Sequence, residues 1–169
     1  MEGESKWYAI YTHSRAEKKV FERLKVAGYE AFLPLITTIK QWSDRKKKVE
    51  VPLINSFVFV NTNNDKLNKT LSIPGVVTVL KYLGKPAVVR NEEIENLKIL
   101  VNSNEDFQKI ESINLEKGED IVVTKGPFMG LFAKYIQCSG KHKVIVEVEA
   151  IKSFFEVTIP LSHISKINS

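Results

Sequence analysis

The hydrophobic positions at the start of the chain predict a strand followed by an amphipathic helix. Residues 6–11 are rich in aromatic and aliphatic side chains, as in a buried strand. Residues 14–27 instead place apolar side chains every three or four positions, on one helical face. Ser14 and Glu17 have the spacing of a capping box, and Gly28 follows as a left-handed stop.

The middle of the chain predicts extended structure around a charged hairpin. Residues 29–34 and 36–42 are extended, and residues 43–48 form the charged tip between two arms. Residues 56–61 alternate, so that two phenylalanines share one face of a strand and two valines share the other. A short helix over 65–71, a strand over 76–82 and a helix over 92–101 complete this part. The order predicts an α+β sandwich, an antiparallel sheet flanked by helices.

The remainder of the chain is different in pattern. Residues 102–117 are polar and acidic without a clear period, which predicts a linker. Short strands are then expected over 120–124, 133–137, 143–149, 155–160 and 164–167. Five short strands in so few residues favour a small closed β-barrel. The predicted domains are therefore residues 5–101 and 118–169, joined by a linker over residues 102–117.

The two parts of the chain differ in net charge. The net charge is +5, but residues 1–101 hold 17 Lys and Arg against 11 Asp and Glu, whereas residues 102–169 hold 8 against 9. Only the first part is suited to a polyanionic partner. The single cysteine, Cys138, suits a reducing compartment, and no apolar run is long enough to span a membrane. We expect a cytoplasmic protein that has no membrane partner and is a monomer.

The sequence lacks recognisable catalytic patterns. It has no glycine-rich phosphate loop, no H-E-x-x-H and no G-x-S-x-G. His13, His142 and His163 are scattered along the chain, and no Cys/His pair has metal-ligand spacing. We therefore expect no enzymatic activity, no cofactor and no metal. A small enzyme with an unrecognised site stays open as an alternative, and it would require a pocket with perturbed titratable groups.

A strand that leads into a tight turn is the sharpest local motif. It runs through residues 122–130, V-V-T-K-G-P-F-M-G. Gly126 and Gly130 permit positive φ or close backbone approach, Pro127 fixes one turn position, and Phe128 can plug one end of a barrel. The plain alternative is a hairpin turn in an unrelated β domain.

This turn resembles the KOW motif, whose barrel ends proteins of the NusG family. Landmarks of the family's N-terminal domain resemble residues 6–11, 17–20 with Leu24, 32–34, 52–60, 74–76 and 84–87. Residues 32–36, Trp42 with residues 44–48, and residues 84–87 are more similar to the specialised paralogues RfaH and the UpxY group. Ala133, where many KOW motifs have Gly, and residues 66–69 depart from the family patterns.

The resemblance implies a site for RNA polymerase. In the family an apolar depression binds the clamp helices of the largest polymerase subunit, and an aromatic groove is well suited to an amphipathic helix. The alternative for each of these side chains is ordinary core burial. The corresponding residues are Tyr8, Phe57, Phe59, Val79 and Tyr82.

The resemblance also implies a DNA site. The edge of the first helix faces the non-template strand in the family, and the hairpin tip projects toward upstream DNA. Lys and Arg can neutralise phosphates there, although a solvated helix face or a solubilising loop would have the same composition. The candidates are His13, Arg15, Lys18, Lys19 and Arg23 near the helix, and Arg45, Lys46, Lys47 and Lys48 in the hairpin.

These expectations combine into a non-catalytic transcription elongation or antitermination factor, which suppresses pausing or termination and is specific to certain operons. The KOW domain would recruit a second protein, by resemblance a small-subunit ribosomal protein or a termination factor. The β-branched residues of its strands predict a barrel and no helical state. The alternative function is a KOW-containing RNA-binding or ribosome-associated protein, which would require a basic barrel.

Overall fold

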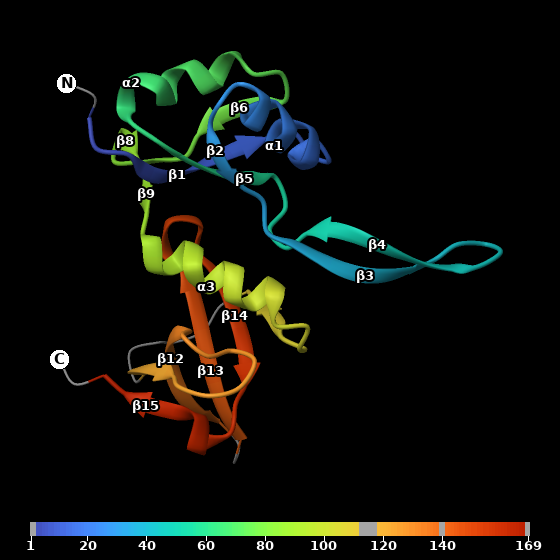
Figure 1. The fold of residues 1–169 in the computed structure, drawn as a ribbon, viewed down its shortest axis with the longest axis vertical. Coiled ribbons are helices and arrows are strands. Elements are labelled where there is room, and N and C mark those ends of the chain that lie inside the picture. The colour runs from blue at the N-terminus through green and yellow to red at the C-terminus, as the bar shows by residue number, and fades with distance from the viewer. Residues whose placement is uncertain (1–2, 112–117, 139–140, 168–169) are drawn as a thin grey trace. The chain divides into compact units, whose positions relative to one another are not determined.

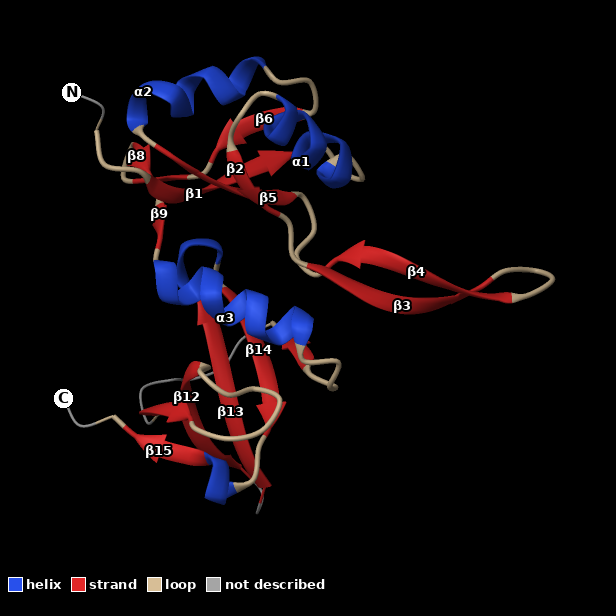
Figure 2. Ribbon diagram, viewed as in Figure 1, coloured by secondary structure: helices blue, strands red, loops and turns tan. Residues whose placement is uncertain are grey.

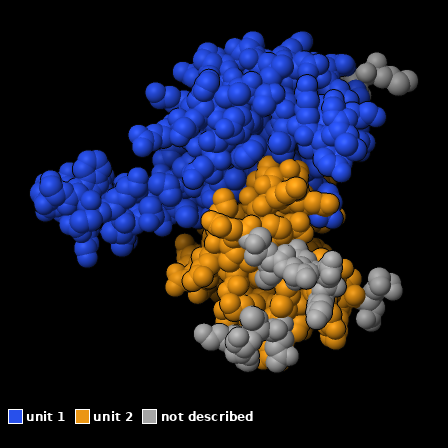
Figure 3. Space-filling view, turned by 180° about the vertical axis from the view of Figure 1, so that it is seen from behind, with its two compact units in different colours: residues 1–90 blue, residues 91–169 orange. Residues whose placement is uncertain are grey.

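The protein folds into two compact units, Met1–Arg90 and Asn91–Ser169 (Figure 3). The computed structural model describes residues 3–111, 118–138 and 141–167. The division falls before the helix that was expected to close the N-terminal domain. Residues 112–117 of the expected linker lie outside the described residues, and the limits of linker and domains stay a prediction.

An antiparallel sheet forms the centre of the first unit (Figure 1). Its strands follow the order β2-β5-β1-β6, and β9 also pairs with β1. These strands are β1 (Lys6–Thr12), β2 (Glu30–Phe32), β5 (Phe57–Thr62), β6 (Val76–Val79) and β9 (Val88–Val89). At its centre β1 and β5 pair over six residues each, and most of these side chains are buried.

Helices cover one face of this sheet, as Figure 1 shows. They are α1 (Glu17–Val26), α2 (Asn64–Leu67) and the 3-10 helix η1 (Asn68–Ser72). Tyr8 and Val60 lie opposite each other on the covered face, and both pack in the core with Leu24 of α1 and Leu67 of α2. The alternation predicted for residues 56–61 is confirmed, because Val58 and Val60 belong to this core.

The start of α1 differs from the prediction. Ala16 is the N-cap residue and its side chain makes no capping bond, so the capping box at Ser14 was wrong. Arg15 has a φ of 64°, which turns the chain sharply before the helix. The Glu17 carboxylate is buried and accepts a hydrogen bond from the Ser56 backbone N–H at 2.8 Å. A contact between distant segments has replaced the local cap.

The end of α1 is the predicted left-handed stop. Gly28 has a φ of 87°. Its N–H donates to the Lys25 carbonyl, and the Tyr29 N–H donates to the Leu24 carbonyl, both at 3.0 Å. This pair of bonds is the Schellman motif, which satisfies carbonyls that the helix end leaves free.

Two hairpins lie outside the central sheet (Figure 2). The larger one, the β3–β4 ribbon, pairs β3 (Leu35–Gln41) with β4 (Lys46–Pro52) and extends away from the rest of its unit. The smaller one pairs β7 (Lys81–Tyr82) with β8 (Lys85–Pro86). The strand expected over 76–82 is therefore two strands, β6 and β7, on either side of Leu80, whose N–H donates to the Ala9 carbonyl of β1 and whose carbonyl accepts from the Ala87 N–H.

The second unit is an antiparallel sheet of six strands in the order β10-β14-β13-β12-β11-β15. The α+β class is confirmed, but five strands were predicted. The extra strand is β10, inside the expected linker, where Phe107 packs edge-to-face on Phe155 of β14 at 6.1 Å. The strands are β10 (Gln108–Ile110), β11 (Glu119–Val123), β12 (Phe132–Cys138), β13 (Lys141–Val148), β14 (Ser153–Thr158) and β15 (Ile164–Lys166), with 3-10 turns η2 (Glu149–Ile151) and η3 (Leu161–His163).

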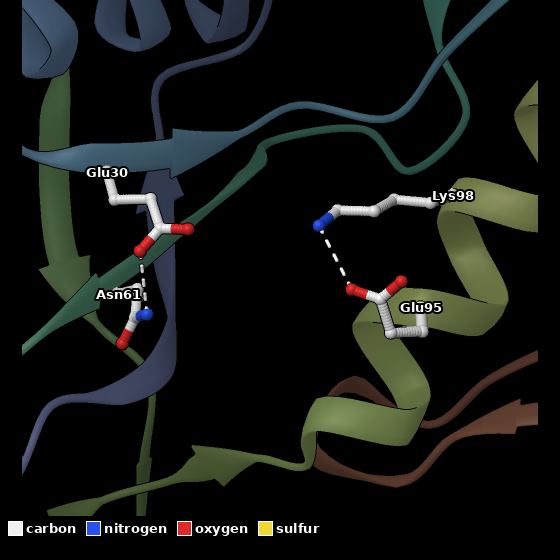
Figure 4. Close-up of polar contacts among 4 residues, drawn as sticks. All are labelled: Glu30, Asn61, Glu95 and Lys98. Atoms are coloured by element: carbon white, nitrogen blue, oxygen red, sulfur yellow. Dashed lines mark hydrogen bonds and ion pairs between the residues drawn. The ribbon is translucent and has the colours of Figure 1, made fainter.

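Helix α3 (Asn91–Asn102) is hydrogen-bonded to the six-stranded sheet. The Asn96 side chain donates to the Phe132 carbonyl at 2.7 Å and accepts from the Phe132 N–H at 3.0 Å. Glu93 accepts from the Glu149 N–H at 2.8 Å. The Asn96 amide thus pairs with a strand residue as another strand would. On α3 itself, Lys98 and Glu95 form an ion pair at 3.1 Å (Figure 4).

Candidate functional site

The sheet of the first unit has an aromatic face, opposite the one that α1 and α2 cover. Tyr11 lies opposite Phe57 and Phe32 lies opposite Phe59 in the strand register. The Tyr11 and Phe57 rings meet edge-to-face at 5.4 Å, and the Phe32 and Phe59 rings stack at 6.3 Å. These four residues define the aromatic face. Tyr11 is 40% exposed and Phe57 is half-buried, whereas Phe59 is fully buried.

The structure divides the predicted polymerase residues among three places. Phe57 and Phe59 belong to the aromatic face. Tyr8 and Val79 lie in the core beneath the helices, on the other face. The Tyr8 hydroxyl donates to the Asn64 side chain at 3.1 Å, and burial raises the pKa of Tyr8. Tyr82 is 72% exposed in the small β7–β8 hairpin. The predicted cluster is therefore not one surface.

Sequence reasoning missed two members of the aromatic face, Tyr11 and Phe32. The signal for Tyr11 was available, because residues 7, 9 and 11 of a strand point to the same side. The sequence did not show which residues of β5 share that side, because this depends on the register between β1 and β5. Glu30 and Asn61 lie opposite each other at the edge of this face, and Asn61 donates to Glu30 at 2.8 Å (Figure 4).

A groove of about 400 Å³ lies between the start of α1 and the base of the β3–β4 ribbon. Lys18 connects its two walls, since its ammonium donates to the Glu50 carbonyl at 2.6 Å. Arg15 and Lys40 bring further positive charge from opposite sides. We call this the basic groove; it is lined by Ser14, Arg15, Glu17, Lys18, Lys40, Val51, Pro52 and Asn55. Lys40 was not among the predicted site residues.

The other predicted cations near α1 have different surroundings. His13 and Lys19 are exposed. Arg23 donates to the Pro74 carbonyl at 2.7 Å, and the His13 N–H donates to the Gly75 carbonyl at 2.9 Å. These bonds hold the turn before β6 against α1. Arg23 thus has a structural contact besides any role toward a ligand.

Cations crowd the outer half of the β3–β4 ribbon. Arg45, Lys46, Lys47 and Lys48 are all exposed, but only Arg45 lies in the predicted tip, since the three lysines belong to β4. Lys40 lies directly opposite Lys47, which is an unfavourable cross-strand pair. Within the part of the chain that the structure describes, these five side chains have no ion-pair or hydrogen-bond partner. The charge is available to an external ligand.

The predicted turn motif between β11 and β12 has the expected geometry. Gly126 and Gly130 have φ values of 82° and 92°, and Phe128 is buried. The Gly130 N–H donates to the Val123 carbonyl at 2.8 Å, which closes the turn. A side chain at Gly126 would also meet the His163 ring at 3.1 Å. Pro127 is exposed on this turn.

Among residues 3–111, 118–138 and 141–167, no group of three His, Cys, Asp or Glu residues is arranged to hold a metal ion. In the same residues, no helix is long and apolar enough to cross a membrane.

Comparison with known proteins gives consistent matches. The family model for NusG, described as transcription termination factor nusG, matches residues 5–98. A transcription termination/antitermination protein NusG from Rickettsia bellii is 28% identical, over 73% of this chain and 69% of the relative. The protein of the same name from Campylobacter jejuni is 30% identical, over 76% and 77%. Among solved structures, "Domain interaction in Thermotoga maritima NusG" has a TM-score of 0.49 and 22% identity, with 98% of each chain covered.

Proposed function

The chain belongs to the NusG family of transcription termination and antitermination proteins, and from this premise we propose that it is a non-catalytic factor that stays with elongating RNA polymerase. Its first unit would bind polymerase through the aromatic face and non-template DNA through the basic groove. Its second unit would recruit another protein. The effect would be to suppress pausing or termination.

One observation carries the DNA part of this proposal. The basic groove combines Arg15 and Lys18 from α1 with Lys40 from the β3–β4 ribbon, although these segments are far apart in the sequence. Cations on two walls can neutralise consecutive phosphates of one strand without reading its sequence. The groove therefore suits a single strand that is held by its backbone.

The polymerase contact is assigned to the exposed part of the aromatic face. Tyr11 and Phe57 pack edge-to-face and retain accessible ring surface. Aromatic side chains with little conformational freedom dominate the binding energy of many interfaces, and an amphipathic helix is a suitable partner. The proposed partner is the pair of clamp helices in the largest polymerase subunit. Tyr8 and Val79 are omitted because they lie in the core.

The proposed mechanism needs no chemistry. A protein that binds the elongating conformation of polymerase more tightly than the paused one shifts the equilibrium by the difference in affinity. The second unit, with the turn through Gly126 and Gly130, is assigned to a small-subunit ribosomal protein or a termination factor. Because the second unit is attached to the first, its partner would be held at a raised effective concentration near the polymerase. We also propose that the factor serves particular operons, as a specialised paralogue.

A pull-down with purified full-length protein tests the polymerase contact. Core RNA polymerase should be recovered with the unchanged protein and lost with a Tyr11→Ala, Phe57→Ala double variant. Val26→Ala is the matched control, because Val26 is 88% exposed and lies on α1, away from the aromatic face. Recovery of ribosomal RNA without polymerase would instead favour the ribosome-associated alternative.

The basic groove is tested by the salt dependence of binding to single-stranded DNA. Each lost phosphate contact should reduce the slope of log K against log salt concentration by about 0.7. We expect this reduction for Arg15→Gln and for Lys40→Gln. Lys81→Gln, at an exposed position of the same unit, should leave the slope unchanged. Equal slopes for all three variants would remove the groove from the proposal.

A further inference from the structure

The basic groove contains one acidic side chain among its cations. Glu17 is the only carboxylate among the eight residues that line the groove, and it is 5% exposed. Its Oε1 atom accepts a hydrogen bond from the Ser56 N–H at 2.8 Å. Among the residues that the structure describes, its Oε2 atom has no hydrogen-bond partner and the side chain forms no ion pair. The wall of a groove assigned to DNA therefore holds a carboxylate oxygen with free lone pairs.

The position of this carboxylate is fixed by the backbone on both sides of it. Arg15, just before α1, and Ser56, just before β5, both have a φ of 64°. Residues other than glycine are uncommon in this left-handed region, and the surrounding structure has to hold them there. The hydrogen bond from the Ser56 N–H to Glu17 joins the two turns. Glu17 is thus a held acceptor and not a freely moving surface group.

A carboxylate in this groove can bond only to certain parts of a DNA strand. An ionised carboxylate accepts hydrogen bonds and donates none. Phosphate oxygens are also acceptors, and they suit the Arg and Lys side chains of the groove instead. The donors of a DNA strand are on its bases, and cytosine N4 and adenine N6 are amino groups of this kind. Thymine has the acceptor O4 where cytosine has its amino group. The chemistry of Glu17 therefore fits a base that carries an exocyclic amino group.

The same chemistry disfavours a base without that group. A base that enters the groove displaces water from the carboxylate, and a carbonyl oxygen in its place would leave the carboxylate without a donor. We propose that Glu17 is a specificity-determining residue, which accepts a hydrogen bond from the exocyclic amino group of an unpaired base while the cations of the groove hold the neighbouring phosphates. The proposal rests on the function proposed above, and it adds a base preference that phosphate contacts cannot supply.

Changes on the DNA side test this preference with the full-length protein unaltered. Fluorescence anisotropy would compare labelled single strands of equal length that contain deoxycytidine, deoxyuridine or the 2-pyrimidinone nucleoside, which has hydrogen in place of the amino group of cytosine. All three strands carry the same phosphate charge, so that any difference in affinity comes from the bases. We expect the deoxycytidine strand to bind about tenfold more tightly than either of the others. Equal affinity for the three strands would overturn the proposal.

A change on the protein side assigns the preference to one atom. In Glu17→Gln the amide oxygen can still accept from the Ser56 N–H, and an amino group then takes the place of Oε2. Because an amino group donates, this variant should lose the preference for cytosine and favour uracil, whose O4 accepts. Glu22→Gln is the matched control, since it removes the same charge from an exposed position of α1 outside the groove. A cytosine preference that survives in Glu17→Gln, or disappears in both variants, would contradict the assignment. If circular dichroism shows that Glu17→Gln does not fold, the three strands with the unaltered protein decide.

Two further measurements separate this proposal from its alternatives. The 2′-hydroxyl of RNA is a donor that every nucleotide carries. If a uridine RNA strand binds as tightly as the deoxycytidine strand and is weakened by Glu17→Gln, the carboxylate contacts the sugar and the proposal fails. The salt dependence described above tests the groove itself. Unchanged slopes in Arg15→Gln and Lys40→Gln would remove DNA from the groove, whereas reduced slopes with equal affinity for all three strands would reject the role of Glu17 alone.

Discussion

Two antiparallel strand pairs in the first unit have nearly the same length and opposite surroundings. In the β1–β5 pair the side chains of both strands are mostly buried, and those of one face pack under α1 and α2. In the β3–β4 ribbon the outer side chains are exposed, and two lysines face each other across the strands. Burial of apolar surface stabilises the first pair, whereas the second rests mainly on its backbone hydrogen bonds. The difference is that core packing stabilises the first pair, whereas the second leaves its cations exposed.

The largest effect should come from matched isoleucine substitutions in the two pairs. Ile10 of β1 is fully buried, and Ile39 of β3 is 62% exposed. Ile10→Ala should lower the free energy of unfolding by about 2–5 kcal/mol, because it removes buried methyl groups and leaves a cavity. Ile39→Ala should change it by no more than about 0.5 kcal/mol. Urea denaturation measures both, and equal losses would contradict the comparison.

The same contrast holds for two glycines with positive φ. Gly75 has a φ of 96°, and a Cβ there would come within 2.8 Å of Val20 in the packed core. Gly84, in the exposed β7–β8 hairpin, has a φ of 76° and no heavy atom within 4 Å of that position. Gly75→Ala should cost at least about 2 kcal/mol, from backbone strain and overpacking together. Gly84→Ala should cost about 1 kcal/mol, from strain alone. Thermal unfolding curves would show a larger shift for Gly75→Ala.

The second unit extends the comparison to a polar contact. Asn96 is buried and bonds both backbone groups of Phe132. Asn96→Ala should destabilise that unit by about 1–3 kcal/mol, because it leaves these groups without a partner. Amide hydrogen exchange at Phe132 should accelerate. Asn102→Ala, at the exposed end of α3, should leave the exchange rate unchanged. An unchanged rate in both variants would mean that Asn96 does not hold α3 to the sheet.

The smallest effect is expected in the β3–β4 ribbon. Lys47→Glu replaces a like-charge pair with an opposite-charge pair across from Lys40, which should stabilise the protein by about 0.2–1 kcal/mol. Binding to DNA should weaken at the same time. Lys48→Glu is the control, since Lys48 faces Ile39 and has no like charge opposite. Both variants should weaken DNA binding, and a gain in stability for Lys47→Glu alone would show that the lysine pair is retained for a ligand.

Features set by neighbouring residues were predicted correctly, whereas features set by contacts between distant segments were missed. Gly28 ends α1 as predicted, because a left-handed stop depends on the glycine and its immediate neighbours. The positive φ of Gly126 and Gly130 was predicted for the same reason. The capping box at Ser14 failed because Glu17 found a distant partner in the Ser56 N–H. Strand β10 was missed because its pairing depends on Phe155, which lies more than 40 residues later in the sequence.

The candidate site shows the same division. The hairpin and its exposed cations were predicted from a local pattern, a charged run between extended arms. The run was placed wholly in the tip, which was wrong for Lys46, Lys47 and Lys48, because they pair with β3 as part of β4. Lys40 was missed, because only the approach of the ribbon to α1 makes it part of the basic groove. Tyr8 and Val79 were grouped with Phe57, although the strand register places them on the other face of the sheet.

The sequence by itself determined the α+β class, most strands and helices, the uneven charge and the resemblance to the NusG family. These depend on periodicity, turn residues and motifs within short segments. Only the tertiary structure decided that Tyr11 joins Phe57, that Lys40 joins Arg15, and that Asn96 of α3 bonds to β12. The physical reason is that these contacts depend on strand register and on packing between distant segments. Neither can be read from the residues that surround one position in the sequence.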